Sequence, residues 1–395
     1  MRPEFLYIHV PFCARRCSYC DFAVQAVRVP PVAAWLEAVA AELGRVVARE
    51  GWAHLALRTV YVGGGTPSLL GPGAMEALRR ALAPYASWQD ETVEWTAEAN
   101  PESLTPEVAA AWRRAGVNRL SLGVQSFHEP ALRWMGRLHG PEGAERAAQA
   151  ARRAGFENVS VDLIFGLPAR LGRSWPADLE RALSLEPDHI SLYGLTAEPG
   201  TPLGRWVAEG RERLPDEDAY AEEYLLAAER LAAEGFHHYE VSNFARPGRE
   251  SRHNVAYWSG AAYLGLGPGA HSYLPPVRRW NVRSWDEYRA RIAEGQDAAA
   301  GCERVEGGAA SLERVWLALR TSAGLARGGW SLGQERLAVE WARRGWARLD
   351  AERLRLTPRG WLLLDRLAVE FDAAALDALP RSSAHSGCEA PKPES

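Results

Sequence analysis

Three cysteines lie close together near the start of the chain, at Cys13, Cys17 and Cys20. They follow Phe5–Val10, a short apolar run that is typical of a buried strand. A loop with the spacing Cys-x3-Cys-x2-Cys can bind three irons of a [4Fe-4S] cluster and leave the fourth iron without a protein ligand. That iron can coordinate S-adenosylmethionine, whose reductive cleavage gives a 5′-deoxyadenosyl radical.

Two other interpretations of the triplet are a structural zinc site completed by His9 and three ordinary buried cysteines. Structural zinc sites usually draw on paired Cys-x2-Cys knuckles, and the sequence has no second pair. The other two cysteines, Cys302 and Cys388, stand alone, so the count also disfavours a disulfide framework. The spacing therefore favours the iron–sulfur cluster.

Glycines and polar side chains occur at or after the ends of the next predicted strands, and one more, Asp162, lies within the fifth strand and is expected to point inward. In chain order, the candidates are Gly64, Gly65, Thr66, Glu98, Gln125, Arg137 and Asp162. In parallel barrels the C-terminal ends of the strands carry the chemistry, so these residues are expected to converge on one mouth. Successive glycines let the backbone approach a ligand and offer its N–H groups, and an arginine can pair with a carboxylate. With the cysteines, they predict a pocket for S-adenosylmethionine.

Each of these residues also has a structural alternative. Glu98 and Gln125 could cap the helices that follow them. Asp162 and Arg137 could form an ion pair that only supports the fold. The joint occurrence of all these residues at the strand ends is what favours the binding site.

Six strand patterns, each followed by a helical pattern, predict an α/β fold with a parallel sheet. The strands are expected at residues 5–10, 59–62, 93–97, 119–124, 160–164 and 189–195. The helices are expected at residues 35–46, 73–83, 106–115, 141–154 and 174–185. Right-handed crossovers curl such a sheet toward a barrel, but six units are too few for a closed eight-stranded one. We therefore expect a partial (β/α)6 barrel with an open side.

The pattern changes after this barrel, which is expected to span residues 1–200. Residues 201–304 form a flanking segment with a helix at 216–234 and a charge-free, loop-rich stretch at 255–277. Residues 305–380 predict a small winged-helix-like domain with helices at 312–320, 332–344 and 357–367 and a hairpin at 349–356 whose tip is 350–352. The polar residues 381–395 are expected to be disordered.

Composition and charge indicate which kinds of partner the protein can bind and where in the cell it is expected. Hydrophobic residues make up 47% of the 395 positions, enough for a sizeable core, and the net charge of −4 disfavours a nucleic-acid polyelectrolyte. The C-terminal domain has a net charge of +1 and no basic stripe, so no nucleic acid is expected there. We expect this domain to cover the open barrel or to contact a protein. Neither a signal peptide pattern nor a transmembrane run of 18 apolar residues occurs, which predicts a cytoplasmic protein.

The strings YIHVPFCARRCSYCDF, GGGTPS, EANPES, GVQSF and VDLIFGLP occur in this order between residues 5 and 273. They resemble the radical SAM enzymes of the oxygen-independent coproporphyrinogen III oxidase family. Within this family the chain looks most like the HemW branch of haem chaperones. Phe22 stands where the oxidase has a fourth cysteine. The oxidase has a long N-terminal extension before its cluster, and here Cys13 lies too near the start of the sequence for such an extension. Residues 252–258 match the HNxxYW signature of the HemW branch.

The resemblance implies roles for named residues. Tyr7, Gly64 and Glu98 would contact the cluster-bound S-adenosylmethionine. Five more residues match positions that hold a second S-adenosylmethionine in the oxidase: Gly65, Thr66, Gln125, Arg137 and Asp162. In this chain they would bind a second S-adenosylmethionine, the cluster-bound S-adenosylmethionine or the haem.

The resemblance also implies a haem site at His253, which lies at the edge of the charge-free aromatic stretch. A porphyrin needs an apolar slot, aromatic faces and an axial nitrogen. The alternative is that His253 hydrogen-bonds a loop while the aromatic residues fill core. His271 is a second candidate on the same terms.

Two functions follow from these expectations. The first is a haem chaperone that carries haem as cargo to haem-accepting proteins, respiratory enzymes among them, with the [4Fe-4S] cluster and S-adenosylmethionine as structural or regulatory parts. The second is an oxidase that decarboxylates the propionates of coproporphyrinogen III. Phe22 favours the first, and a homodimer is compatible with either.

Overall fold

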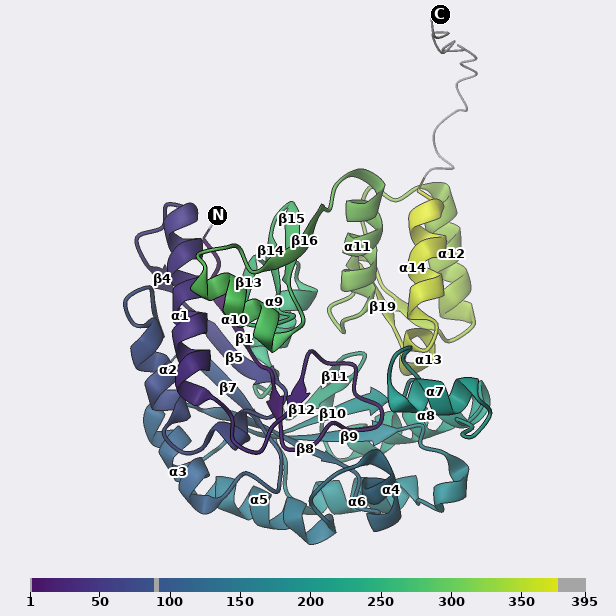
Figure 1. Cartoon of the computed structure of the whole chain (residues 1–395). Helices are drawn as coiled ribbons and strands as arrows, with labels where there is room; N and C mark the ends of the chain where they lie inside the picture. The colour runs from purple at the N-terminus through teal and green to yellow at the C-terminus, as the bar shows by residue number, and fades with distance from the viewer. Residues whose placement is uncertain (1, 89–91, 376–395) are drawn as a thin grey trace, which may run out of the picture.

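Six parallel strands form the centre of the molecule, and helices cover their outer face (Figure 1). The computed structural model describes residues 2–88 and 92–375. The strands are β1 (Phe5–Val10), β5 (Thr59–Gly64), β7 (Glu94–Ala99), β8 (Arg119–Gln125), β9 (Val159–Phe165) and β10 (His189–Gly194). The helices that follow them are α1 (Val32–Arg49), α2 (Ala74–Leu82), α3 (Pro106–Ala115), α5 (Pro141–Arg153), α6 (Trp175–Ser184) and α8 (Glu217–Ala233). The predicted α/β fold with a partial (β/α)6 barrel is confirmed.

Later segments lengthen the same sheet at both of its ends. Beyond β10 lie the antiparallel strands β12 (Asn243–Ala245) and β11 (His237–Glu240). Beyond β1 lies the parallel strand β13 (Tyr263–Leu266), followed by the antiparallel strands β14 (His271–Leu274), β15 (Val277–Asn281) and β16 (Ala299–Arg304). The sheet thus has twelve strands and curls around an open side.

The stretch 255–277 is more ordered than its expected loop-rich character. It contains the end of helix α9 (Arg252–Trp258) and the strands β13 and β14. Gly260, Gly267 and Gly269 have φ values of 70°, 95° and 68°, which side chains other than glycine rarely adopt. These glycines turn the chain between elements that are too short to show a clear periodicity.

The C-terminal domain begins with α11 (Gly307–Leu319) and has a hydrophobic core of its own. Its other elements are β17 (Leu325–Ala326), α12 (Leu332–Arg343), β18 (Ala347–Leu349), β19 (Arg353–Leu356), α13 (Pro358–Trp361) and α14 (Leu364–Ala373). The strands β18 and β19 form the expected hairpin with residues 350–352 at its tip. The tail at 381–395 lies outside the described residues.

The inside of the barrel is polar, whereas the apolar core lies between the sheet and its helices. On β8, Leu120, Leu122 and Val124 are fully buried in the main hydrophobic core. Ser121, which points to the other face, donates hydrogen bonds to Asp162 on β9 (3.0 Å). None of the helices in residues 2–88 and 92–375 has the length and apolar character that a bilayer crossing needs.

Candidate functional site

A pocket of about 360 Å³ opens at the C-terminal ends of the barrel strands. The predicted site residues that line it are Cys13, Cys17, Cys20, Gly64, Gly65, Thr66, Glu98, Gln125, Arg137 and Asp162. They come from the cysteine loop after β1, from the ends of β5, β7 and β8, and from the middle of β9, while Arg137 follows the short helix α4 (Glu129–Met135). The expected convergence on one mouth of the barrel therefore holds for these ten residues.

The cysteine loop is closed by the short parallel pair β2 (Phe12–Cys13) and β3 (Gln25–Ala26). Burial raises the pKa of the Cys13 thiol to about 11 and also raises the pKa of Cys20. Bound metal would reverse this effect, since a coordinating thiol is deprotonated.

The three thiols share one pocket but do not converge on one point. Within the part of the chain that the structure describes, no three His, Cys, Asp or Glu side chains are grouped closely enough to hold a single metal ion. A cubane cluster binds each thiolate through a different iron. Three thiols in one pocket are a donor set that such a cluster can use.

A chain of hydrogen bonds joins two of the cysteines through side chains of the barrel. Thr66 Oγ1 donates to Cys13 Sγ (3.4 Å), and Asn100 Nδ2 donates to Thr66 Oγ1 (3.1 Å). Arg137 Nη2 donates to Asn100 Oδ1 (2.6 Å), while its Nη1 donates to Cys17 Sγ (3.7 Å). Asn100 was not among the predicted site residues, although it follows Glu98 in the same strand-end string.

The glycine run serves the protein's own backbone and side chains. Gly64 has a φ of 102°, and a Cβ there would lie 2.3 Å from the His9 ring. Its N–H donates to Glu98 Oε2 (2.9 Å), and the N–H of Gly65 donates to the Val10 carbonyl (2.8 Å). These two N–H groups are therefore not offered to a ligand, contrary to the expectation from the sequence.

Glu98 is held in place by two donors at the base of the pocket. Besides Gly64, the Tyr61 hydroxyl donates to Glu98 Oε1 (2.8 Å). Burial raises the pKa of Glu98 to about 7, with these hydrogen bonds opposing the shift. The carboxyl group can thus change its protonation near neutral pH.

Two buried polar atoms in the pocket wall lack a hydrogen-bond partner among the described residues: Gln125 Oε1 and Arg137 Nε. Unpaired buried polar atoms are costly, so they fit a ligand rich in polar groups, such as the methionyl and ribose parts of S-adenosylmethionine. Asp162 accepts hydrogen bonds from Ser121 and forms no ion pair with Arg137 among these residues. The structural ion pair that the sequence left open is therefore not formed.

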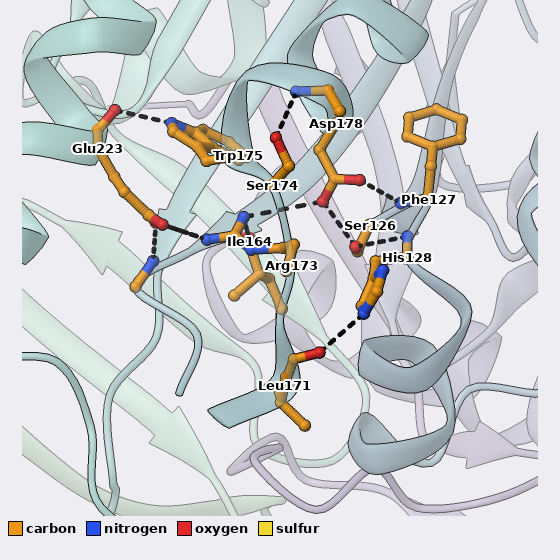
Figure 2. A network of polar contacts seen from close by, with 12 residues as sticks. Ser126, Phe127, His128, Ile164, Leu171, Arg173, Ser174, Trp175, Asp178 and Glu223 are labelled. Atoms are coloured by element: carbon orange, nitrogen blue, oxygen red, sulfur yellow. Dashed lines mark hydrogen bonds and ion pairs between the residues drawn. The ribbon is translucent and has the colours of Figure 1, made fainter. Parts of the chain in front are cut away.

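A buried polar network fixes the loop that follows Gln125 (Figure 2). Asp178 on α6 accepts hydrogen bonds from the Ser126 hydroxyl (2.6 Å) and from the Phe127 N–H (2.9 Å). Gln125 itself has a φ of 69°, a left-handed conformation that is unusual for a residue with a side chain. The contacts of Asp178 hold the two residues after this turn.

The same network extends to the exit of β9 through Arg173, whose side chain is buried. Arg173 lies 3.7 Å from Asp178 and 2.6 Å from Glu223 on α8. Glu223 accepts a hydrogen bond from the N–H of Gly166 (2.7 Å). Helices α6 and α8 are thereby tied to the strand ends that shape the pocket.

Two predicted residues, Tyr7 and His253, do not line this pocket. The Tyr7 hydroxyl is hydrogen-bonded to His9 Nδ1 (2.9 Å), and His9 Nε2 is bonded to the Ala23 carbonyl (2.9 Å). Both ring nitrogens of His9 are thus engaged inside the protein, which argues against a zinc ligand at this position.

His253 lies on α9 at the opposite end of the barrel, next to the first residue of β5. Its Nδ1 is bonded to Thr59 Oγ1 (2.6 Å) and its Nε2 to the Tyr257 hydroxyl (2.9 Å). The side chain is 1% exposed, and burial lowers its pKa to about 3. In this conformation His253 has no free nitrogen for a haem iron, which corresponds to the alternative in which it hydrogen-bonds its neighbours.

Comparison with known proteins gives consistent matches. A model of the radical SAM superfamily matches residues 7–180. The heme chaperone HemW of Mycobacterium tuberculosis is 39% identical over 368 residues, covering 92% of this chain and 93% of that protein. The heme chaperone HemW of Bacillus subtilis is 37% identical over 321 residues, covering 81% and 84%. Coproporphyrinogen III oxidase HemN of Escherichia coli has the same fold, with a TM-score of 0.78 at 22% identity over 94% of this chain and 90% of that one.

Proposed function

Because the chain belongs to the radical SAM superfamily and, within it, to the family of the HemW haem chaperones, we propose that it binds haem and passes it to haem-dependent proteins. We further propose that it carries a [4Fe-4S] cluster and S-adenosylmethionine, and that it works in the cytoplasm. Respiratory enzymes are the acceptors that we favour.

One observation carries the cofactor proposal: three cysteines share a pocket with unpaired polar atoms of the strand ends. Cys13, Cys17 and Cys20 would hold the cluster, which when bound supplies an electron to the sulfonium of S-adenosylmethionine. Glu98 would accept hydrogen bonds from the ribose hydroxyls or the methionyl amine. Arg137 would keep Cys17 oriented and offer its free Nε to the ligand.

Phe22 supports a carrier rather than an oxidase. Its side chain lines the pocket and is 62% exposed. A phenyl group cannot supply the thiol that the oxidase resemblance places at this position. The propionate chemistry would lose that participant, while an apolar macrocycle could still be accommodated.

The experiment combines iron analysis with two porphyrin assays. Anaerobic reconstitution of the full chain should give about four irons per chain. Replacing Cys13, Cys17 and Cys20 by alanine should abolish this iron and its charge-transfer absorbance. Cys302→Ala, which removes an exposed lone cysteine, is the matched control and should retain both.

The reconstituted protein should bind haemin in a titration but should not consume coproporphyrinogen III with reductant and S-adenosylmethionine. Catalytic conversion of coproporphyrinogen III would contradict the chaperone proposal. Full iron content in the triple cysteine variant would contradict the cluster assignment.

A further inference from the structure

Two of the three cysteines accept hydrogen bonds from one connected group of side chains, which we call the polar bridge (Thr66, Asn100 and Arg137). Thr66 Oγ1 donates to Cys13 Sγ (3.4 Å), and Arg137 Nη1 donates to Cys17 Sγ (3.7 Å). The three residues follow β5, β7 and α4, so they belong to three successive parts of the barrel. The fold, and not one local loop, therefore brings these donors to the thiols.

Asn100 lies at the centre of the polar bridge and sets the direction of its hydrogen bonds. Its Nδ2 donates to Thr66 Oγ1 (3.1 Å), and its Oδ1 accepts from Arg137 Nη2 (2.6 Å). Because the Thr66 hydroxyl accepts from Asn100, its single hydrogen is left to donate to Cys13. The backbone N–H of Asn100 donates to Ser68 Oγ (3.1 Å), which fixes the residue in place. Asn100 thus controls two thiol contacts without being a cysteine neighbour in the chain.

Arg137 brings a positive charge to the Cys17 thiol. Its guanidinium also donates to the Gly123 carbonyl, and a Cβ at Gly123 would lie 3.0 Å from Asn100 Oδ1 and 3.4 Å from Arg137 Nη2. The missing side chain of Gly123 therefore makes room for this approach. Within residues 2–88 and 92–375, Arg137 forms no ion pair with a carboxylate, so its charge is not neutralised by direct contact.

Donors and charges of this kind act on an iron–sulfur cluster through its sulfur ligands. Reduction adds one negative charge to the cluster, and hydrogen bonds to the thiolates stabilise the more negative form more strongly. A positive charge acts in the same direction, and its effect is large in a pocket of low dielectric constant. Both parts of the polar bridge should therefore favour the reduced cluster.

From these contacts, we propose that Thr66, Asn100 and Arg137 are positioning residues that raise the reduction potential of the cluster held by Cys13 and its two partners. This inference rests on the cluster in the proposed function. It gives Thr66 and Arg137 a task other than holding a second S-adenosylmethionine. A stabilised reduced cluster is also a weaker electron donor to S-adenosylmethionine, which suits a carrier better than an enzyme that cleaves this molecule in every cycle.

The test is a redox titration of the reconstituted full chain without S-adenosylmethionine, followed by electron paramagnetic resonance. Asn100→Asp replaces the amide donor by an acceptor and adds a negative charge, so the Thr66 hydroxyl should turn away from Cys13. The ratio of reduced to oxidised cluster at a fixed potential should fall by about tenfold or more, the size of effect expected for a charge-assisted hydrogen bond. For a one-electron couple this is a decrease of about 59 mV or more in the midpoint potential.

Iron content should stay at the wild-type level in Asn100→Asp, because Asn100 is not a cluster ligand. Gln296→Glu is the matched control, since it makes the same change from amide to carboxylate at an exposed position after α10 (Trp285–Ala293). Its midpoint potential should equal that of the wild-type chain.

Two pairs of variants separate the hydrogen bond from the charge. Thr66→Val removes the donor to Cys13 at nearly constant shape and should lower the potential, whereas Thr66→Ser keeps the hydroxyl and should restore the wild-type value. Arg137→Gln removes the positive charge near Cys17 and should lower the potential, whereas Arg137→Lys keeps the charge and should lie closer to the wild-type value.

The outcomes distinguish this inference from the proposed function. If the wild-type chain and the variants assemble the cluster with equal potentials, the inference is wrong and the proposed cluster stands. If Asn100→Asp fails to assemble a cluster, the comparison of Thr66→Val with Thr66→Ser decides, and equal potentials in these two variants overturn the inference. If the wild-type chain itself assembles no cluster, the proposed function loses its cofactor and the inference fails with it.

Discussion

Glu98 combines a buried carboxyl group with a position at the base of the pocket, so its protonation should control ligand binding. Its pKa of about 7 means that the group is mostly neutral at pH 6 and mostly ionised at pH 8. Only the ionised form can accept further hydrogen bonds with both oxygens while Tyr61 and Gly64 donate to it.

We therefore expect the affinity for S-adenosylmethionine to rise by about tenfold between pH 6 and pH 8. Glu98→Gln should bind more weakly at pH 8 and show a flatter profile, because its amide does not ionise. Calorimetric titrations of both proteins across this range measure the effect. Identical pH profiles for the two proteins would remove Glu98 from the site.

At the residue scale, spacing and strand position revealed most of the pocket. The ends of parallel strands meet at one edge, so Glu98, Gln125 and Asp162 could be grouped without a structure. The hydrogen-bond partners of these residues could not be predicted from the sequence. The hydrogen bond between Gly64 and Glu98, for example, joins two strands that are far apart in sequence. His253 shows the same limit. The sequence shows the residue and its aromatic neighbours, but it does not show that the side chain is buried at the opposite end of the barrel from the pocket.

At the scale of elements, Asp178 connects helix α6 with the strand exit that carries Gln125. Asp178→Ala would leave the buried Phe127 N–H without its acceptor. An unsatisfied buried donor costs about 1–3 kcal/mol. We expect this loss in the free energy of unfolding, together with weaker binding of S-adenosylmethionine, because the turn at Gln125 loses its support.

Asp216→Ala is the matched control, since Asp216 caps the N-terminus of α8 at an exposed position. Its loss should cost about 1 kcal/mol and leave ligand affinity unchanged. Denaturant unfolding and calorimetry on the same samples measure both quantities. Unchanged ligand affinity in Asp178→Ala would confine the network of Figure 2 to a role in stability.

The elements of the barrel were predictable because each βα unit repeats one pattern of apolar strand and amphipathic helix. The strands β11–β16 could not be predicted in this way, because they are short and most of them are only partly buried. Their pairing with β10 and β1 depends on distant parts of the chain. The hairpin of β18 and β19 was predictable because alternating residues flank the turn at Asp350.

At the scale of the whole molecule, the C-terminal domain contacts the barrel sheet through an ion pair whose carboxylate is fully buried. Arg320, at the end of α11, lies 2.9 Å from Glu240 on β11. Its guanidinium also lies 3.9 Å from the ring centre of Trp258 and 5.2 Å from that of Trp316. Trp258 belongs to the HNxxYW string, so this motif takes part in fixing the two parts of the molecule to each other.

Removing the positive charge of Arg320 should lower the free energy of unfolding, because the Glu240 side chain is fully buried and would lose its ion-pair partner. Burial already raises the pKa of Glu240, and Arg320 opposes that shift. Breaking a buried ion pair on one side typically costs about 3–5 kcal/mol, so we expect Arg320→Met to lower the free energy of unfolding by this amount. Arg366→Met, which removes an exposed pair with Glu370, should change it by no more than about 0.5 kcal/mol.

The double variant Glu240→Gln/Arg320→Met distinguishes the ion pair from simple packing. It leaves no unpaired buried charge, so most of the stability lost in Arg320→Met should return. Denaturant unfolding followed by circular dichroism measures the free energy of unfolding of the wild-type chain, Arg320→Met, Arg366→Met and the double variant. If the double variant is as unstable as Arg320→Met, the packing of Arg320 between the two indoles, and not its charge, holds the C-terminal domain against the barrel.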